Sequence, residues 1–170
     1  MSRVLSLAIA LCVFGSLPAW PANGQNRPQA FCNVASTGGL TALHPRWQKD
    51  RQSKLFSCDG MNHTDDADYY YEVYGTTAAR AQKIFLHADF WDDASKLDTA
   101  SKEEMGRTLQ PVLESVFSAA GATLPTDIAD AVGTAADVQE DMAFGTVTAR
   151  TTFGQSENYA GEYMIEIDLH

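Results

Sequence analysis

The sequence has few basic residues, few cysteines, and no motif of nucleotide binding or of serine-hydrolase chemistry. Twelve Lys and Arg face twenty-two Asp and Glu in 170 residues, which leaves a formal charge of −10. Nucleic-acid binding depends on basic side chains that neutralise phosphates, so this acidity argues against a nucleic-acid partner. The chain contains no P-loop, no G-x-G-x-x-G and no G-x-S-x-G. We therefore expect no bound cofactor and no serine nucleophile.

Long apolar runs are also scarce, and the one clear run opens the chain. The run Val4–Leu17 is preceded by Arg3 and has fourteen residues, fewer than the roughly 20 that span a bilayer as a helix. This layout is typical of a secretory signal peptide. We predict a signal over residues 1–24, export to a periplasm or the cell exterior, and no stable membrane anchor after cleavage before Gln25. Lipid attachment at Cys12 is the weaker alternative.

The cysteine count predicts one disulfide. Of the three cysteines, Cys12 is lost with the signal, and Cys32 and Cys58 remain. Two cysteines in an exported chain pair by default, because the destination is oxidising. The chain-entropy model assigns such a bond roughly 3 to 4 kcal/mol. The alternative is two separate buried thiols.

Charge is distributed unevenly along the mature chain. Residues 25–58 carry five basic residues and one acidic residue, whereas residues 59–170 carry six basic and twenty-one acidic residues. We therefore predict a basic N-terminal segment over 25–58, tethered by the disulfide, and an acidic α+β domain over 59–170. We favour a basic segment that lies across its own acidic domain, and the alternative is a basic recognition arm.

Four segments have the composition and periodicity of strands. Aromatic and β-branched residues predict a strand over Tyr69–Gly75. Alternating apolar residues predict a second strand over Ala79–Trp91 that pairs with it, and the alternative, suggested by its alanines, is a helix. Two further strands are predicted over Phe144–Phe153 and Tyr159–Leu169, joined by a hairpin turn.

Two helices are predicted between these pairs of strands. Ser101 and Glu104 form a capping box, and apolar residues then recur at helical spacing until Gly121 ends the helix. A shorter helix follows Thr126. The order ββααββ predicts an α+β fold, a two-layer sandwich in which two helices cover one face of a four-stranded antiparallel sheet.

Two polar segments precede the first predicted strand. Pro45 could open a short helix through Lys54, with Trp47, Arg51 and Leu55 on one side. The acidic, turn-rich segment Asp59–Asp68 is interpreted as a surface loop.

The aromatic residues around the first predicted hairpin suggest a binding surface. Two helices cover only one face of a sheet, so several rings should lie on the other face, where Tyr and Trp favour recognition. The candidate surface residues are Tyr69, Tyr70, Tyr71, Tyr74 and Trp91. Alternatively, the N-terminal segment covers these rings with Phe31 and Trp47.

Candidates for metal binding and acid–base chemistry are weak. His63, Asp65, Asp66 and Asp68 lie within six residues, but their spacing fits no EF-hand. Solvated surface charge is the simpler interpretation, and we expect no metal. A histidine such as His87 on a predicted strand is more often a structural residue than a catalytic base.

These observations favour an exported, non-catalytic protein-binding module of the inhibitor or accessory type. The acidic domain would attract a cationic protein partner. One alternative is a small exported hydrolase acting on cell-wall glycan or peptide, with Asp65, Asp66, His63 and His87 as candidate residues. Another alternative is a structural component of an envelope assembly.

Overall fold

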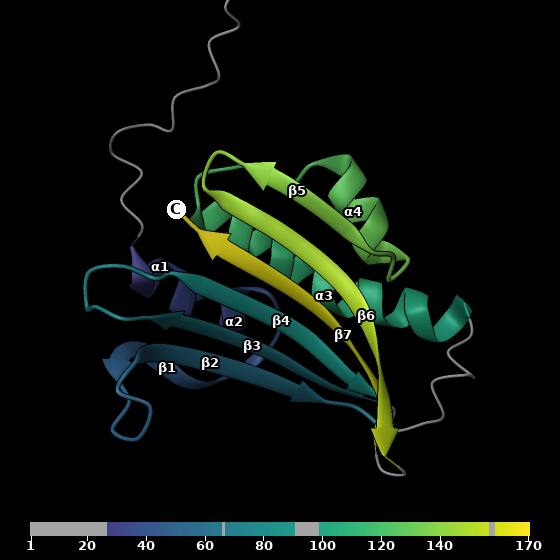
Figure 1. Cartoon of the computed structure of the whole chain (residues 1–170), viewed down its shortest axis with the longest axis horizontal. Coiled ribbons are helices and arrows are strands. Elements are labelled where there is room, and N and C mark those ends of the chain that lie inside the picture. The colour runs from purple at the N-terminus through teal and green to yellow at the C-terminus, as the bar shows by residue number, and fades with distance from the viewer. Residues whose placement is uncertain (1–26, 66, 91–98, 157–158) are drawn as a thin grey trace, which may run out of the picture.

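The computed structural model describes residues 27–65, 67–90, 99–156 and 159–170, in which it places four helices and seven strands (Figure 1). The helices are α1 (Pro28–Cys32), α2 (Val34–Thr37), α3 (Thr99–Ala119) and α4 (Thr126–Gly133). The strands are β1 (Thr41–Lys49), β2 (Phe56–His63), β3 (Ala67–Gly75), β4 (Lys83–Phe90), β5 (Val138–Met142), β6 (Gly145–Ser156) and β7 (Tyr159–Leu169).

All seven strands form one antiparallel sheet in the order β1-β2-β3-β4-β7-β6-β5. Strands β1 to β4 pair in sequence, and so do β5 to β7. The two meanders meet where β4 pairs with β7, from Lys83 opposite Asp168 to Phe90 opposite Gly161. The helices α3 and α4 lie in the connection between the meanders, so they are positioned to cover both.

One face of the sheet, called here the inner face, packs against the helices. Its central side chains are the buried residues Ile84, Leu86 and Ala88 of β4 and Tyr163, Ile165 and Ile167 of β7. The sheet curves around α3 (Figure 1), which buries Met105, Gly106, Leu109, Val112, Leu113, Val116 and Phe117. Burial of each large apolar side chain contributes about 1.5 to 3 kcal/mol, so this contact forms the core.

The N-terminal helices α1 and α2 extend the cover of the inner face over β2 and β3. The hydroxyl of Tyr71 donates a hydrogen bond to the Phe31 carbonyl at 2.9 Å. Gly60 of β2 lets α2 approach, because a Cβ atom there would lie 2.6 Å from the Cβ of Ala35. The Sγ atoms of Cys32 and Cys58 lie 2.14 Å apart, which confirms the predicted pair as one at disulfide distance.

The rest of the predicted basic segment forms strand β1 at one edge of the sheet. The Trp47 indole N–H donates to the Ala78 carbonyl at 3.1 Å, and the ring stacks on Phe56. Pro45 and two register shifts interrupt the pairing of β1 with β2. Such features blunt an edge strand against unwanted pairing. The proposed division of the chain at position 58 stays a prediction, and this position lies within β2.

The predicted four-stranded sheet with the order ββααββ is wrong. The sheet has seven strands and the observed order is ααββββααβββ, because β1, β2 and β5 were not recognised as strands. The two central helices do lie on one face, as expected. The individual predictions of β3, β4, α3, α4, β6 and β7 as elements are confirmed, although β4 begins at Lys83 and not at Ala79. The predicted capping box is wrong, because α3 begins at Thr99 and Ser101 lies inside the helix.

Two segment predictions are corrected for related reasons. The segment Pro45–Lys54 is not helical, because its first half belongs to β1. Most of the segment Asp59–Asp68 is not a loop, because β2 continues to His63 and pairs with β3 residue by residue. Proline is tolerated at an edge strand, and glycine within a strand often marks a close approach of another segment. In the sequence, Pro45 and Gly60 resembled the residues that mark turns.

A pair of glycines at the crossing of α3 and α4 tests the packing of the inner layer. A Cβ atom on Gly106 would lie 2.5 Å from the Cα of Gly133, whereas a Cβ on Gly133 would meet only Gln110 Oε1, at 3.8 Å. We expect Gly106→Ala to lower the free energy of unfolding by about 1 to 3 kcal/mol through overpacking. Gly133→Ala should leave it unchanged or raise it by up to about 1 kcal/mol. Urea unfolding of both variants checks this, and destabilisation of equal size would contradict it.

The cysteine pair predicts a second stability effect. The two residues are 26 positions apart, and their bond joins α1 to β2. Replacing both by alanine should lower the free energy of unfolding by roughly 3 kcal/mol. Chemical unfolding with and without reductant measures the effect. If the parent protein unfolds at the same denaturant concentration in both conditions, the bond contributes no stability.

Candidate functional site

The face of the sheet that points away from the helices is the candidate site, and we call it the open face. No helix in the described part of the chain packs on it (Figure 1). Strand register places the following side chains of β2, β3, β4 and β7 there: Ser57, Asp59, Met61, His63, Asp68, Tyr70, Glu72, Tyr74, Lys83, Phe85, His87, Asp89, Glu162, Met164, Glu166 and Asp168. The alternation of buried and half-buried residues along β3 and β4 gives the sheet one apolar and one mixed face.

Two ring pairs occupy the middle of the open face. The rings of Tyr70 and His87 stack with centroids 4.7 Å apart and an interplanar angle of 19°. Towards the Lys83 end of the same strands, Tyr74 and Phe85 meet edge to face with ring centroids 5.9 Å apart. These residues are half-buried by their neighbours on the sheet. Rings held in this way offer rigid apolar area to a partner at little cost in conformational entropy.

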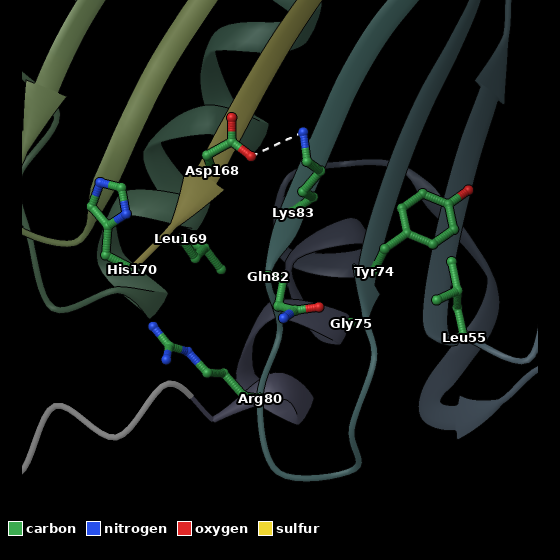
Figure 2. A pocket seen from close by; sticks show the side chains of 9 residues that line it. All are labelled: Leu55, Tyr74, Gly75, Arg80, Gln82, Lys83, Asp168, Leu169 and His170. Atoms are coloured by element: carbon green, nitrogen blue, oxygen red, sulfur yellow. Dashed lines mark ion pairs between the residues drawn. The ribbon is translucent and has the colours of Figure 1, made fainter.

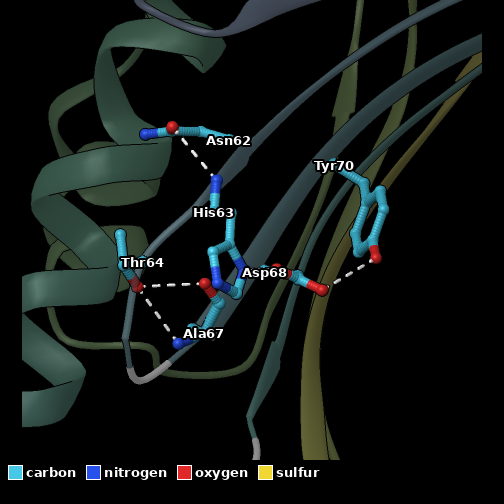
Figure 3. Close-up of polar contacts among 6 residues, drawn as sticks. All are labelled: Asn62, His63, Thr64, Ala67, Asp68 and Tyr70. Atoms are coloured by element: carbon cyan, nitrogen blue, oxygen red, sulfur yellow. Dashed lines mark hydrogen bonds and ion pairs between the residues drawn. The ribbon is translucent and has the colours of Figure 1, made fainter.

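A hydrogen-bonded chain of polar groups continues from Tyr70 towards β2 (Figure 3). The Tyr70 hydroxyl donates to Asp68 Oδ2 at 3.1 Å, and Asp68 Oδ1 lies 2.5 Å from Nδ1 of His63. Burial and the neighbouring Asp68 carboxylate raise the pKa of Tyr70. The turn that carries Asp68 is fixed by the Thr64 hydroxyl, which accepts from the Ala67 amide and donates to the Ala67 carbonyl. Asp68 is therefore a buried carboxylate with its partners in place.

Three carboxylates lie side by side across β3, β4 and β7. Asp68 is opposite Asp89, and Asp89 is opposite Glu162 in the next strand pair. Burial raises the pKa of Asp89, His87 at 3.4 Å partly offsets this, and the charges of Glu162 and Asp68 add to the rise. Like charges at directly opposed positions destabilise a sheet. This acidic row is therefore unfavourable for folding.

The open face is strongly acidic as a whole. Seven of its side chains on these four strands are carboxylates, and Lys83 is the single Lys or Arg among them. Lys83 pairs with Glu166 and, at 2.9 Å, with Asp168. These two carboxylates raise the pKa of Lys83, so it remains charged and neutralises one end of the face. The other end holds the acidic row, whose neighbouring basic side chains are His63 and His87.

The residues proposed from sequence as a binding surface separate onto the two faces. Tyr70 and Tyr74 lie on the open face, whereas Tyr69 and Tyr71 lie on the inner face and are only 2% and 0% exposed. A partner that docks on the open face therefore contacts the first pair and not the second. Trp91 lies outside the described residues.

The residues considered for hydrolysis or metal binding are only partly brought together. His63 and His87 lie on the open face, on either side of Tyr70, while Asp65 is exposed in the turn before β3 and Asp66 is outside the described residues. The His63 ring is 68% exposed at the surface. Among the described residues, no group of three or more His, Cys, Asp and Glu side chains is arranged to hold a metal ion.

Sequence reasoning missed the carboxylates as members of one site. Asp59 and Asp68 were assigned to a loop, and Glu72, Asp89 and Glu162 belonged to predicted strands without being connected to one another. The alternation along the predicted strands did place Glu162 and Glu166 on one side of the last strand. The missing information was the pairing of β4 with β7, which brings the two sets together.

The raised pKa of Asp89 predicts that removing the charge of this side chain stabilises the fold, by an amount that depends on pH. A carboxyl group with a raised pKa stabilises the fold below its ordinary pKa of 3.8, and this contribution is lost as pH rises through the folded-state pKa. Asp89→Asn should therefore stabilise the protein at neutral pH, by about 0.5 to 1 kcal/mol. The gain should shrink as pH approaches 3.8. Thermal unfolding across this range measures it.

The control for this experiment is Glu140→Gln on the exposed edge strand β5. It removes one negative charge at a position away from the acidic row, so it separates the local effect from that of net charge. A gain of the same size for both variants would contradict a local origin in the row.

Membrane-spanning helices and known relatives also bear on the role of this face. In the described part of the chain, no helix is long and apolar enough to cross a membrane. Comparisons with models of protein families, with curated proteins and with solved structures found no match.

Proposed function

We propose that this protein is a non-catalytic binding module that engages a cationic protein through the open face. One observation carries the proposal: seven carboxylates share, with the stacked Tyr70 and His87, a sheet face that no described helix covers. Acidic clusters and aromatic residues on one rigid surface are the features that recognise basic proteins.

The rigidity of the face supports a role in recognition. Its side chains project from four neighbouring strands whose other face is buried in the core. A partner would therefore meet a surface that is already ordered, which lowers the entropy lost on binding. The aromatic pairs would supply the apolar centre of the contact, and the surrounding carboxylates would supply long-range attraction and register.

The proposed location is a periplasm or the cell exterior. The predicted signal over residues 1–24 motivates it, and the Cys32–Cys58 pair at disulfide distance supports it, because disulfides persist in oxidising compartments. In that location, a small acidic module would act as an inhibitor or as an accessory of a basic exported protein.

An exported hydrolase is the second candidate, and the contact between His63 and Asp68 is the observation that favours it. A carboxylate on one ring nitrogen orients a histidine, as in catalytic dyads. However, the pair lies on the open face, and the His63 side chain is 68% exposed there. The dyad also orders the turn before β3, which gives it a structural role.

Charge reversal on the open face tests the leading proposal. The immobilised protein is exposed to an exported-protein extract at low ionic strength, and any retained protein is identified, purified and titrated. We expect a basic partner whose affinity falls with added salt and falls about tenfold or more with Glu72→Lys. Glu72 is half-exposed near His87, so the change should spare the fold.

The matched control is Glu103→Lys on α3, which makes the same charge change on an exposed helix. It should weaken binding much less than Glu72→Lys. If both reversals have the same effect, attraction depends on net charge alone and not on the open face. If no retained protein shows salt-sensitive affinity, the proposed function is wrong.

A further inference from the structure

A pocket of about 590 Å³ lies where β3, β4 and β7 meet at one end of the sheet (Figure 2). Arg80 and Gln82 come from the segment between β3 and β4, Tyr74 and Lys83 from those strands, and Leu169 from the end of β7. Its volume is in the range of sites that bind small molecules, about 300 to 1,000 Å³. It is separate from the acidic row, which lies at the other end of the same strands.

The polar lining of this pocket is rich in hydrogen-bond donors. Arg80 makes no ion pair or side-chain hydrogen bond with any other residue that the structure describes. Figure 2 shows its side chain extending towards His170 and Leu169, on the opposite side of the pocket from Tyr74 and Leu55. Gln82 accepts a hydrogen bond from the Thr76 amide with its Oε1 atom at 3.0 Å, which leaves its NH₂ group as a donor. Donors without partners in a pocket favour a ligand that carries an anionic acceptor.

The charged side chains of the lining also favour an anionic ligand. Lys83 is neutralised by Asp168 at 2.9 Å and by Glu166, so the positive charge of Arg80 remains unbalanced among the lining residues. An arginine in such a position binds a carboxylate with two parallel hydrogen bonds.

The rest of the lining is apolar except for the His170 side chain. Leu55, Leu169 and the Tyr74 ring line the pocket. Burial, with smaller contributions from Glu72 and Asp59, raises the pKa of Tyr74 to about 12, so the phenol stays neutral. A ligand that fits both parts of the lining has an acidic group at one end and an aliphatic or aromatic group at the other.

We propose that this pocket binds a small organic acid, with its carboxylate on Arg80 and its apolar part against Leu55, Tyr74 and Leu169. The site goes beyond the proposed protein interaction and does not depend on it. Binding of such an acid would be reversible and would require no covalent step.

The experiment uses 3-phenylpropanoate as the probe, titrated into the full mature chain and followed by calorimetry and by backbone amide NMR shifts. We expect saturable binding, with shifts concentrated at Gly75, Gln82 and Leu169. The neutral 3-phenylpropanamide and the short acid acetate should each bind about tenfold or more weakly, because each lacks one of the two contacts.

Two charge-matched variants locate the carboxylate. Arg80→Gln should weaken binding of 3-phenylpropanoate by about tenfold or more. Arg150→Gln, on an exposed position of β6 outside the pocket, should change it by less than about twofold. Both arginines are exposed, and equal melting temperatures would confirm that the fold is intact.

Three results would overturn this inference: no saturable binding, equal binding of the acid and its amide, or equal effects of the two arginine variants. Acetate binding as tight as that of 3-phenylpropanoate would overturn the apolar contact and leave a simple anion site. None of these outcomes bears on the Glu72→Lys experiment, since Glu72 does not line the pocket.

Discussion

Burial of the inner face beneath α3 is the constraint on which the rest of the structure depends. Two meanders of strands contribute apolar side chains to one surface, and α3 covers that surface with residues from Met105 to Phe117. The short helices α1 and α2 complete the cover, anchored by the bond from Tyr71 to the Phe31 carbonyl. Once every helix lies on one side, strict alternation along the strands assigns the remaining side chains to the open face.

The residues of the open face fit a role in recognition better than a role in stabilising the fold. Stability alone does not call for Asp68, Asp89 and Glu162 at adjacent positions, since their mutual repulsion works against the sheet. Residues that are unfavourable for folding often belong to functional surfaces, where the rest of the fold offsets their effect. This supports the proposed binding of a basic partner and explains why the acidic row lies beside ordered aromatic rings.

The sequence allowed prediction where one physical signal dominated. Alternation in β4 and β7, and helical spacing in α3, come from burial on one side, and these elements were predicted. Strands β1 and β2 are polar, contain Pro45 and Gly60, and depend on pairing partners that are not visible locally. Both faces of β3 carry rings, so period-two alternation placed Tyr69 with Tyr71 but did not show which face was buried. That choice is made by long-range packing.

The order of the strands also has a consequence for how the chain folds. Every strand pair joins neighbours along the chain except β4 with β7, whose pairing of Phe90 with Gly161 closes a loop of about 70 residues. Each meander can form hairpins locally, yet neither buries its apolar surface until α3 lies beneath both. The halves therefore depend on each other, and the pairing of β4 with β7 is the one in the sheet that joins segments far apart in the sequence.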